Sequence, residues 1–205
     1  MVIEELGPRV ANVWNHLRPT TKNLVEKAWQ SSATGVTQQL PRVSAYDPRA
    51  DQELSQLLTA LDEHAQQTEV SAGREGARES RRLADACANV LSQQTQSAEV
   101  FAQLIGRAHQ RRNYAQVDVL AALLPERLAP SELCELARSN NVIVRALAHE
   151  TLTQFPTSLL AALLRDPIDA VVARQALERQ ANEFGSEDAH RALHESIGGF
   201  EENFD

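Results

Sequence analysis

Apolar residues recur along most of the chain at the spacing of an amphipathic helix. Between residues 47 and 67 they form a single stripe, three or four positions apart: Leu54, Leu57, Leu58 and Leu61. This period places them on one face of an α-helix, whereas the alternation of β-branched and polar residues that marks a strand is missing. The pattern therefore predicts an all-α chain whose helices each bury one face.

Proline and short polar residues mark where the helices begin. We expect a hairpin from Pro8 to Leu17 and from about Thr20 to Gln30, because a residue before proline avoids the α region. Asp47-Pro48 predicts a further start, with an aspartate cap before a proline at the first helical position. That helix is expected to reach about Gln67, with a break near residues 71–73. Further helices are expected at about 75–95, 97–112, 114–124, 131–138, 142–154, 158–165, 168–183 and 187–196.

Residues 31–48 show no periodicity and contain Gly35 and Pro41, so we expect a linker there. The chain then divides into an N-terminal helical hairpin with this linker (1–46), a long-helix bundle or capping unit (47–112), and repeats with an acidic tail (113–205). The alternative is one continuous domain over residues 47–197. Short breaks predict antiparallel neighbours throughout.

The C-terminal part contains an internal repeat. Residues 141–156 and 170–185 superpose with a 29-residue offset, which pairs Val142 with Val171 and Arg145 with Arg174. The preceding helices also match, with LCELAR (133–138) over LAALLR (160–165). Self-similarity at such a period is typical of stacked-repeat proteins, which bury a core between neighbours and leave faces free for other molecules.

Two short motifs connect this repeat with a known family. Val144-Arg145-Ala146 follows an Asn-Asn turn, and Val172-Ala173-Arg174 follows Asp166-Pro167. With these motifs, residues 131–196 resemble a short HEAT-type α-solenoid of the variety found in bacterial proteins, and the resemblance extends less clearly back to residue 97. It implies a binding scaffold and identifies no substrate.

Charge is unevenly distributed, and this narrows the classes of partner. The net charge is −8; residues 71–112 carry seven arginines against four carboxylates (+3), whereas residues 113–205 carry seven against fifteen (−8). Nucleic-acid affinity depends on neutralising phosphates, so the acidic repeats disfavour nucleic acid and only the middle segment keeps that possibility open. Two distant cysteines, no signal peptide and no long apolar run lead us to expect a cytoplasmic protein without a membrane span.

Four arginines of the middle segment lie within about 100° of one another on a helical projection. They are Arg74, Arg78, Arg81 and Arg82, here called the arginine stripe. One interpretation is a site for an anion or an acidic partner. The interpretation we favour is a solvated face, because Asp85 follows Arg81 and Arg82 at pairing distance along a helix.

Histidine–glutamate pairs raise a metal hypothesis. They are His149-Glu150 and His194-Glu195, with His190 one turn before His194. The chain is faintly similar in this respect to deoxyhypusine hydroxylases, HEAT-type enzymes that hold iron with repeated His-Glu pairs. However, only two pairs occur, and three residues separate Arg145 from His149, where that family has none. A zinc site from Glu187, His190 and His194 is a geometric alternative, but without a HEXXH motif we favour surface histidines.

The tail FEENFD sets Phe200 and Phe204 among acidic residues. It can be a docking peptide or an ordinary frayed terminus. We favour the frayed terminus.

No glycine loop, GxSxG or CxxC pattern indicates catalysis or a cofactor. We therefore expect a non-catalytic module that binds another protein or peptide, with its oligomeric state left open. The expected surface includes the helices carrying Arg145 and Arg174, then the arginine stripe, then the tail. Alternatively, these two arginines pair with carboxylates such as Asp169. The competing function is a metal- or ligand-dependent enzyme of hydroxylase or lyase type.

Overall fold

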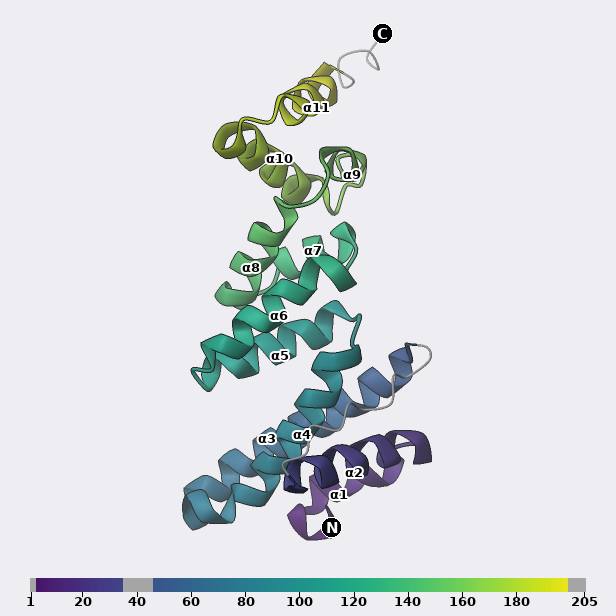
Figure 1. The fold of residues 1–205 in the computed structure, drawn as a ribbon, viewed down its shortest axis with the longest axis vertical. Coiled ribbons are helices and arrows are strands. Elements are labelled where there is room, and N and C mark those ends of the chain that lie inside the picture. Colours follow the sequence, from purple (N-terminus) through teal and green to yellow (C-terminus); the bar gives the residue numbers. More distant parts are fainter. Residues whose placement is uncertain (1–2, 35–45, 199–205) are drawn as a thin grey trace. The chain divides into compact units, whose positions relative to one another are not determined.

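The computed structural model describes residues 3–34 and 46–198. Within these ranges the chain is entirely helical and contains no strand (Figure 1). The prediction of an all-α fold is confirmed. The helices are η1 (Ile3–Leu6), α1 (Pro8–His16), α2 (Pro19–Thr34), α3 (Pro48–Gly76), α4 (Arg78–Gln94), α5 (Ala98–Gln110), α6 (Tyr114–Arg127), α7 (Pro130–Ala137), α8 (Val142–Leu152), α9 (Thr157–Leu163), α10 (Ala170–Phe184) and α11 (Glu187–Gly198).

Several helix starts follow the local chemistry of the sequence. Pro8 occupies the first position of α1, and α3 begins at Pro48 behind an Asp47 cap. The Asp47 carboxylate accepts hydrogen bonds from the backbone N–H groups of Arg49 (3.0 Å) and Ala50 (3.2 Å). These bonds satisfy donors that have no partner within the first turn of the helix.

The prediction of a break at residues 71–73 is wrong. Helix α3 continues to Gly76, and only Ala77 separates it from α4. The Ser71 hydroxyl donates to the carbonyl of Gln67 at 3.1 Å, so its polar group is satisfied inside the helix. A single glycine within a helical pattern is also tolerated at modest cost. Most of the expected linker, residues 35–45, lies outside the described residues.

The helices form two compact units, Met1–Val100 and Phe101–Asp205. In the first unit α3 packs on α4, while α1 packs on α3 and α2 on α4. The leucine stripe predicted for α3 is fully buried, as are the facing residues of α4: Leu83, Ala84, Cys87 and Leu91. The core of this unit is therefore a seam of leucine and small residues between two long helices.

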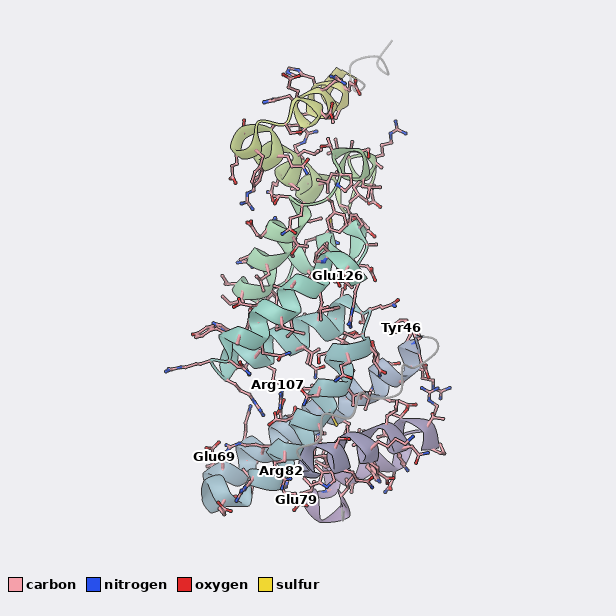
Figure 2. The ribbon with its side chains drawn as sticks, viewed as in Figure 1. Tyr46, Glu69, Glu79, Arg82, Arg107 and Glu126 are labelled. Atoms are coloured by element: carbon pink, nitrogen blue, oxygen red, sulfur yellow. The ribbon has the colours of Figure 1, made fainter. Side chains whose placement is uncertain are left out.

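A buried carboxyl group joins the start of α3 to the residue that ends α4. Asp51 is 2% exposed, and its Oδ2 accepts hydrogen bonds from the Thr95 hydroxyl (2.6 Å) and the Tyr46 hydroxyl (3.1 Å). Tyr46 lies just before α3, at the end of that helix opposite Glu69 (Figure 2). Within the described part of the chain, Oδ1 of Asp51 has no hydrogen-bond partner. This carboxyl group is consequently held in the interior with its polar needs only partly met.

In the second unit α7 packs on α8, α9 on α10, and α11 on both α9 and α10. The buried positions of α8 recur 29 residues later in α10. Four buried residues of α8 each have a buried counterpart in α10. The pairs, α8 before α10, are Val144 and Ala173, Ala148 and Leu177, Thr151 and Gln180, and Leu152 and Ala181. The two helices thus present equivalent faces to the core.

Gln180 fills one of these positions with a polar side chain. Its Nε2 donates to the carbonyls of Thr153 (3.0 Å) and Phe155 (2.7 Å), and its Oε1 accepts from the Thr157 hydroxyl (3.0 Å). The amide therefore links the turn after α8 and the start of α9 to α10. A buried amide with this many partners costs little to bury and fixes the path of the turn.

Candidate binding site

The arginine stripe is divided between two helices. Arg74 belongs to α3, whereas Arg78, Arg81 and Arg82 belong to α4, which begins only at Arg78. Arg78 pairs with Glu75 at 3.1 Å, and Arg81 forms an ion pair with Glu69 of α3. The Arg82 guanidinium lies 5.0 Å from the centre of the Trp29 ring. Glu69 and Arg82 are both visible in Figure 2. These three arginines are therefore engaged within their own unit, which makes the stripe a poor candidate for a binding surface.

Arg145, the first of the two repeat arginines, has a structural role. Its Nη1 donates to the carbonyl of Ser139 at 2.8 Å, which satisfies a backbone acceptor in the turn between α7 and α8. Its expected pairing with Asp169 is wrong. Asp169 is 6% exposed, and the carboxylate accepts instead from Nη1 of Arg138 at 2.7 Å.

Arg174, the second repeat arginine, lines a groove formed by α9, α10 and α11. The groove has a volume of about 520 Å³, which is within the usual range for ligand sites. Its lining residues are Ala161, Leu164, Arg165, Pro167, Ala170, Arg174, Ala192, Glu195 and Ser196. Most of this surface is aliphatic, and the charged groups are two arginines and one glutamate. We call it the α9–α11 groove.

Neither arginine of the groove has a carboxylate partner among the described residues, unlike three other arginines of the second unit. Elsewhere in the second unit, Arg138 pairs with Asp169, Arg179 with Glu150 and Glu183, and Arg191 with Asp188. Among the described residues, Arg174 makes one side-chain hydrogen bond, from Nη2 to the Ser196 hydroxyl at 3.3 Å, and Arg165 makes no side-chain bond. Within the described part of the chain neither guanidinium group forms an ion pair with a carboxylate, so both bring positive charge to the groove.

A second surface feature is a set of exposed aliphatic residues beside the groove. Val142 at the start of α8 is 63% exposed, Val171 at the start of α10 is 65% exposed, and Ile168 in the preceding turn is 68% exposed. The two turns adjoin, because Nη1 of Arg138, four residues before Val142, donates to the Ile168 carbonyl at 3.2 Å. We call Val142, Ile168 and Val171 the turn ridge. Its segment 165–171 also supplies Arg165, Pro167 and Ala170 to the groove.

The residues considered for metal binding do not assemble into a site. His149 is half-buried on α8, where burial and then the charges of Arg179 and Arg145 lower its pKa. Glu150 accepts a hydrogen bond from Arg179 at 3.1 Å, and His190 and His194 are exposed on α11. The described ranges contain no group of three or more His, Cys, Asp or Glu residues that could hold a metal ion.

Both cysteines are buried and unpaired with each other. Burial, together with the nearby Asp169 carboxylate, raises the pKa of the Cys134 thiol to about 11. Because the thiolate is the reactive form, this thiol is poorly suited to nucleophilic chemistry at neutral pH.

Phe200 and Phe204 lie outside the described residues. Among the helices that are described, none combines the length and apolar character that crossing a membrane requires. The chain matches no protein-family model, no curated protein and no solved structure.

Sequence reasoning identified Arg174 but not the groove around it. Arg165 and Ser196 carry no motif, and Glu195 entered only as half of a His-Glu pair. The signal that was present is the pairing of Val142 with Val171 in the repeat alignment. Both valines lie at equivalent helix starts, two positions before the buried Val144 and Ala173. This placement would have indicated that they are exposed apolar residues.

Proposed function

We propose that the protein is a non-catalytic protein–protein interaction module of the α-solenoid type, with HEAT-like repeats over residues 131–196. Its partner docks on the turn ridge. The observation that carries this proposal is the recurrence of an exposed valine, Val142 and Val171, at equivalent positions of two helices whose buried faces also correspond. Stacked repeats commonly use such repeated surface positions for binding.

The energetics of the turn ridge support the same function. Burying a fully exposed valine or isoleucine against a partner contributes about 1.5–3 kcal/mol each, since apolar surface leaves water. Single exposed apolar residues are ordinary, but here three occur in two turns that a hydrogen bond joins, which supports a shared docking surface. The groove that shares the segment 165–171 adds four polar side chains to an otherwise aliphatic lining, and a mixture of apolar and polar groups is typical of protein interfaces.

No observation favours the competing enzyme. A hydroxylase-type site would need convergent metal ligands, and Glu150 is instead hydrogen-bonded to Arg179. The histidines of α11 are exposed.

The test is a capture experiment with matched valine variants of the full chain. A photo-reactive amino acid at Ile168 identifies the protein that contacts the turn ridge in cells. Binding of that protein is then measured for Val142→Ser/Val171→Ser and for the control Val70→Ser/Val119→Ser, which changes two valines that are 91% and 55% exposed elsewhere. We expect the ridge variant to weaken binding by about tenfold or more and the control to leave it unchanged.

Equal binding by both variants would contradict the proposed function. A crosslink between two copies of the chain, with a matching dimer in sedimentation, would replace the partner protein by a second copy.

A further inference from the structure

We propose that the α9–α11 groove binds the carboxylate of an aspartate or glutamate side chain within an acidic-aliphatic segment of the partner protein. This inference rests on the proposed function, because the segment 165–171 carries two residues of the turn ridge and also supplies Arg165, Pro167 and Ala170 to the groove.

The position of Arg174 is the first argument. It is half-buried on α10 and reaches α11, where the Ser196 hydroxyl accepts its Nη2–H at 3.3 Å. That hydroxyl donates in turn to the carbonyl of Leu193 at 2.7 Å. A neutral acceptor orients the guanidinium without neutralising its charge. Since a guanidinium has five N–H donors in a planar fork, Arg174 retains donors suited to a carboxylate.

The charge of the groove is the second argument. Arg165 and Arg174 contribute two positive charges and Glu195 one negative charge, so the lining carries a net charge of +1. A carboxylate, with a single negative charge, balances this lining. A phosphate group, with nearly two negative charges at neutral pH, would overcompensate it and face Glu195. The lining therefore favours a carboxylate over a phosphorylated side chain.

The remaining surface is the third argument. Ala161, Leu164, Pro167, Ala170 and Ala192 give the groove aliphatic walls. Small residues leave room for a neighbouring side chain, and aliphatic walls reward an aliphatic one. The fitting segment consequently places a leucine or valine next to the acidic residue.

The experiment is an NMR titration of the full chain with two blocked pentapeptides of sequence Ala-Leu-Glu-Leu-Ala and Ala-Leu-Gln-Leu-Ala. The two differ only in the charge of the central residue. We expect the glutamate peptide to bind about tenfold more tightly and to shift the amide signals of Ala170, Ala192 and Ser196. Inorganic phosphate serves as a third probe, and we expect it to bind more weakly than the glutamate peptide.

Variants separate a groove-specific effect from general electrostatics. We expect Arg174→Gln to abolish the preference for glutamate and Arg174→Lys to restore it in part, because lysine keeps the charge and loses the fork. Arg191→Gln removes the same charge from an exposed pair on α11 and should keep the preference. Unchanged far-ultraviolet circular dichroism confirms that each variant is folded.

Three results would overturn the inference: equal affinity for both peptides, equal loss in Arg174→Gln and Arg191→Gln, or tighter binding of phosphate. If one of these occurs while the Val142→Ser/Val171→Ser variant still loses its partner, the carboxylate inference fails and the interaction function stands. If the preference for glutamate holds but the ridge variant keeps its partner, the groove stands and the ridge is not the docking surface.

Discussion

Arg138 and Asp169, 31 residues apart in the sequence, form an ion pair in which Nη1 of the arginine lies 2.7 Å from Oδ1 of the carboxylate. Arg138 ends α7 and Asp169 precedes α10. The same Nη1 also donates to the Ile168 carbonyl. One side chain thus holds together the two turns that carry the turn ridge.

Removing Arg138 should destabilise the protein because Asp169 is buried and would keep an uncompensated charge. The Arg138 side chain is 38% exposed, so solvent screens part of the interaction. We expect Arg138→Ala to cost about 1–3 kcal/mol in the free energy of unfolding. Arg191→Ala is the control, because its exposed pair with Asp188 should contribute only about 0–1 kcal/mol. Equal losses in urea denaturation would contradict a special role for the Arg138–Asp169 pair.

Gln180 is expected to be one of the most sensitive polar positions. Gln180→Leu introduces an apolar side chain of similar size, which leaves the carbonyls of Thr153 and Phe155 without this donor. An orphaned buried group costs about 1–3 kcal/mol, and the Phe155 bond is only partly buried, so we expect a loss of about 2–4 kcal/mol. Gln175→Leu on the exposed face of the same helix is the matched control. Calorimetry should show a clear decrease in melting temperature for the first variant and little change for the second.

Asp51 should make stability fall as pH rises. Burial raises the pKa of its carboxyl group above the ordinary value, although hydrogen bonds from Thr95 and Tyr46 partly oppose the rise. Because the folded-state pKa exceeds the unfolded one, the stabilising effect of the bound proton is fully present below the unfolded pKa. It is lost as pH rises through the folded pKa.

Asp51→Asn cannot ionise, so the difference between the variant and the wild type isolates this carboxyl group. We expect the variant to gain free energy of unfolding relative to the wild type as pH is raised from about 4 to about 7. Urea denaturation at a series of pH values measures the difference. A difference that stays constant over this range would show that Asp51 does not titrate abnormally.

Two helix ends offer a reciprocal test of backbone conformation. Arg112, after α5, has a φ of 56°, and Gly185, after α10, has a φ of 66°. This left-handed region costs about 1–2 kcal/mol for a residue with a Cβ. We expect Arg112→Gly to stabilise the chain by only about 0.5–1 kcal/mol, because the greater freedom of glycine in the unfolded state offsets part of the relieved strain.

Gly185→Ala should have the opposite effect, a loss of about 1 kcal/mol. A Cβ at Gly185 would meet no atom within 4 Å, so the loss would come from the backbone alone. Chemical denaturation of both variants tests the pair, and changes of the same sign would contradict the explanation.

Local signals in the sequence accounted for much of the fold. The leucine stripe of α3, the Asp47-Pro48 start and the absence of strand patterns needed only helical periodicity and capping chemistry. The boundary between α3 and α4 was misplaced, because an isolated glycine within a helical pattern is tolerated at a cost of about 1 kcal/mol and the neighbouring residues continue the helix.

The ion-pair partners of the arginines did not follow from helical spacing. Helical spacing indicated Asp85 as the partner of Arg81, but Arg81 pairs with Glu69 on the neighbouring helix. Asp169 was also expected as an example of a carboxylate that pairs with a repeat arginine, but it pairs with Arg138. Long flexible side chains reach several acceptors, so the packing of distant helices determines which acceptor is near.

By itself the sequence determined the helical class, most helix starts and the buried stripes, because these depend on residues within a few positions of one another. Only the tertiary structure decided that Arg165 and Arg174 line a common groove and that Val142 and Ile168 lie in adjoining turns. These relationships join different helices and depend on how side chains pack between the helices. No local pattern of the sequence encodes that packing.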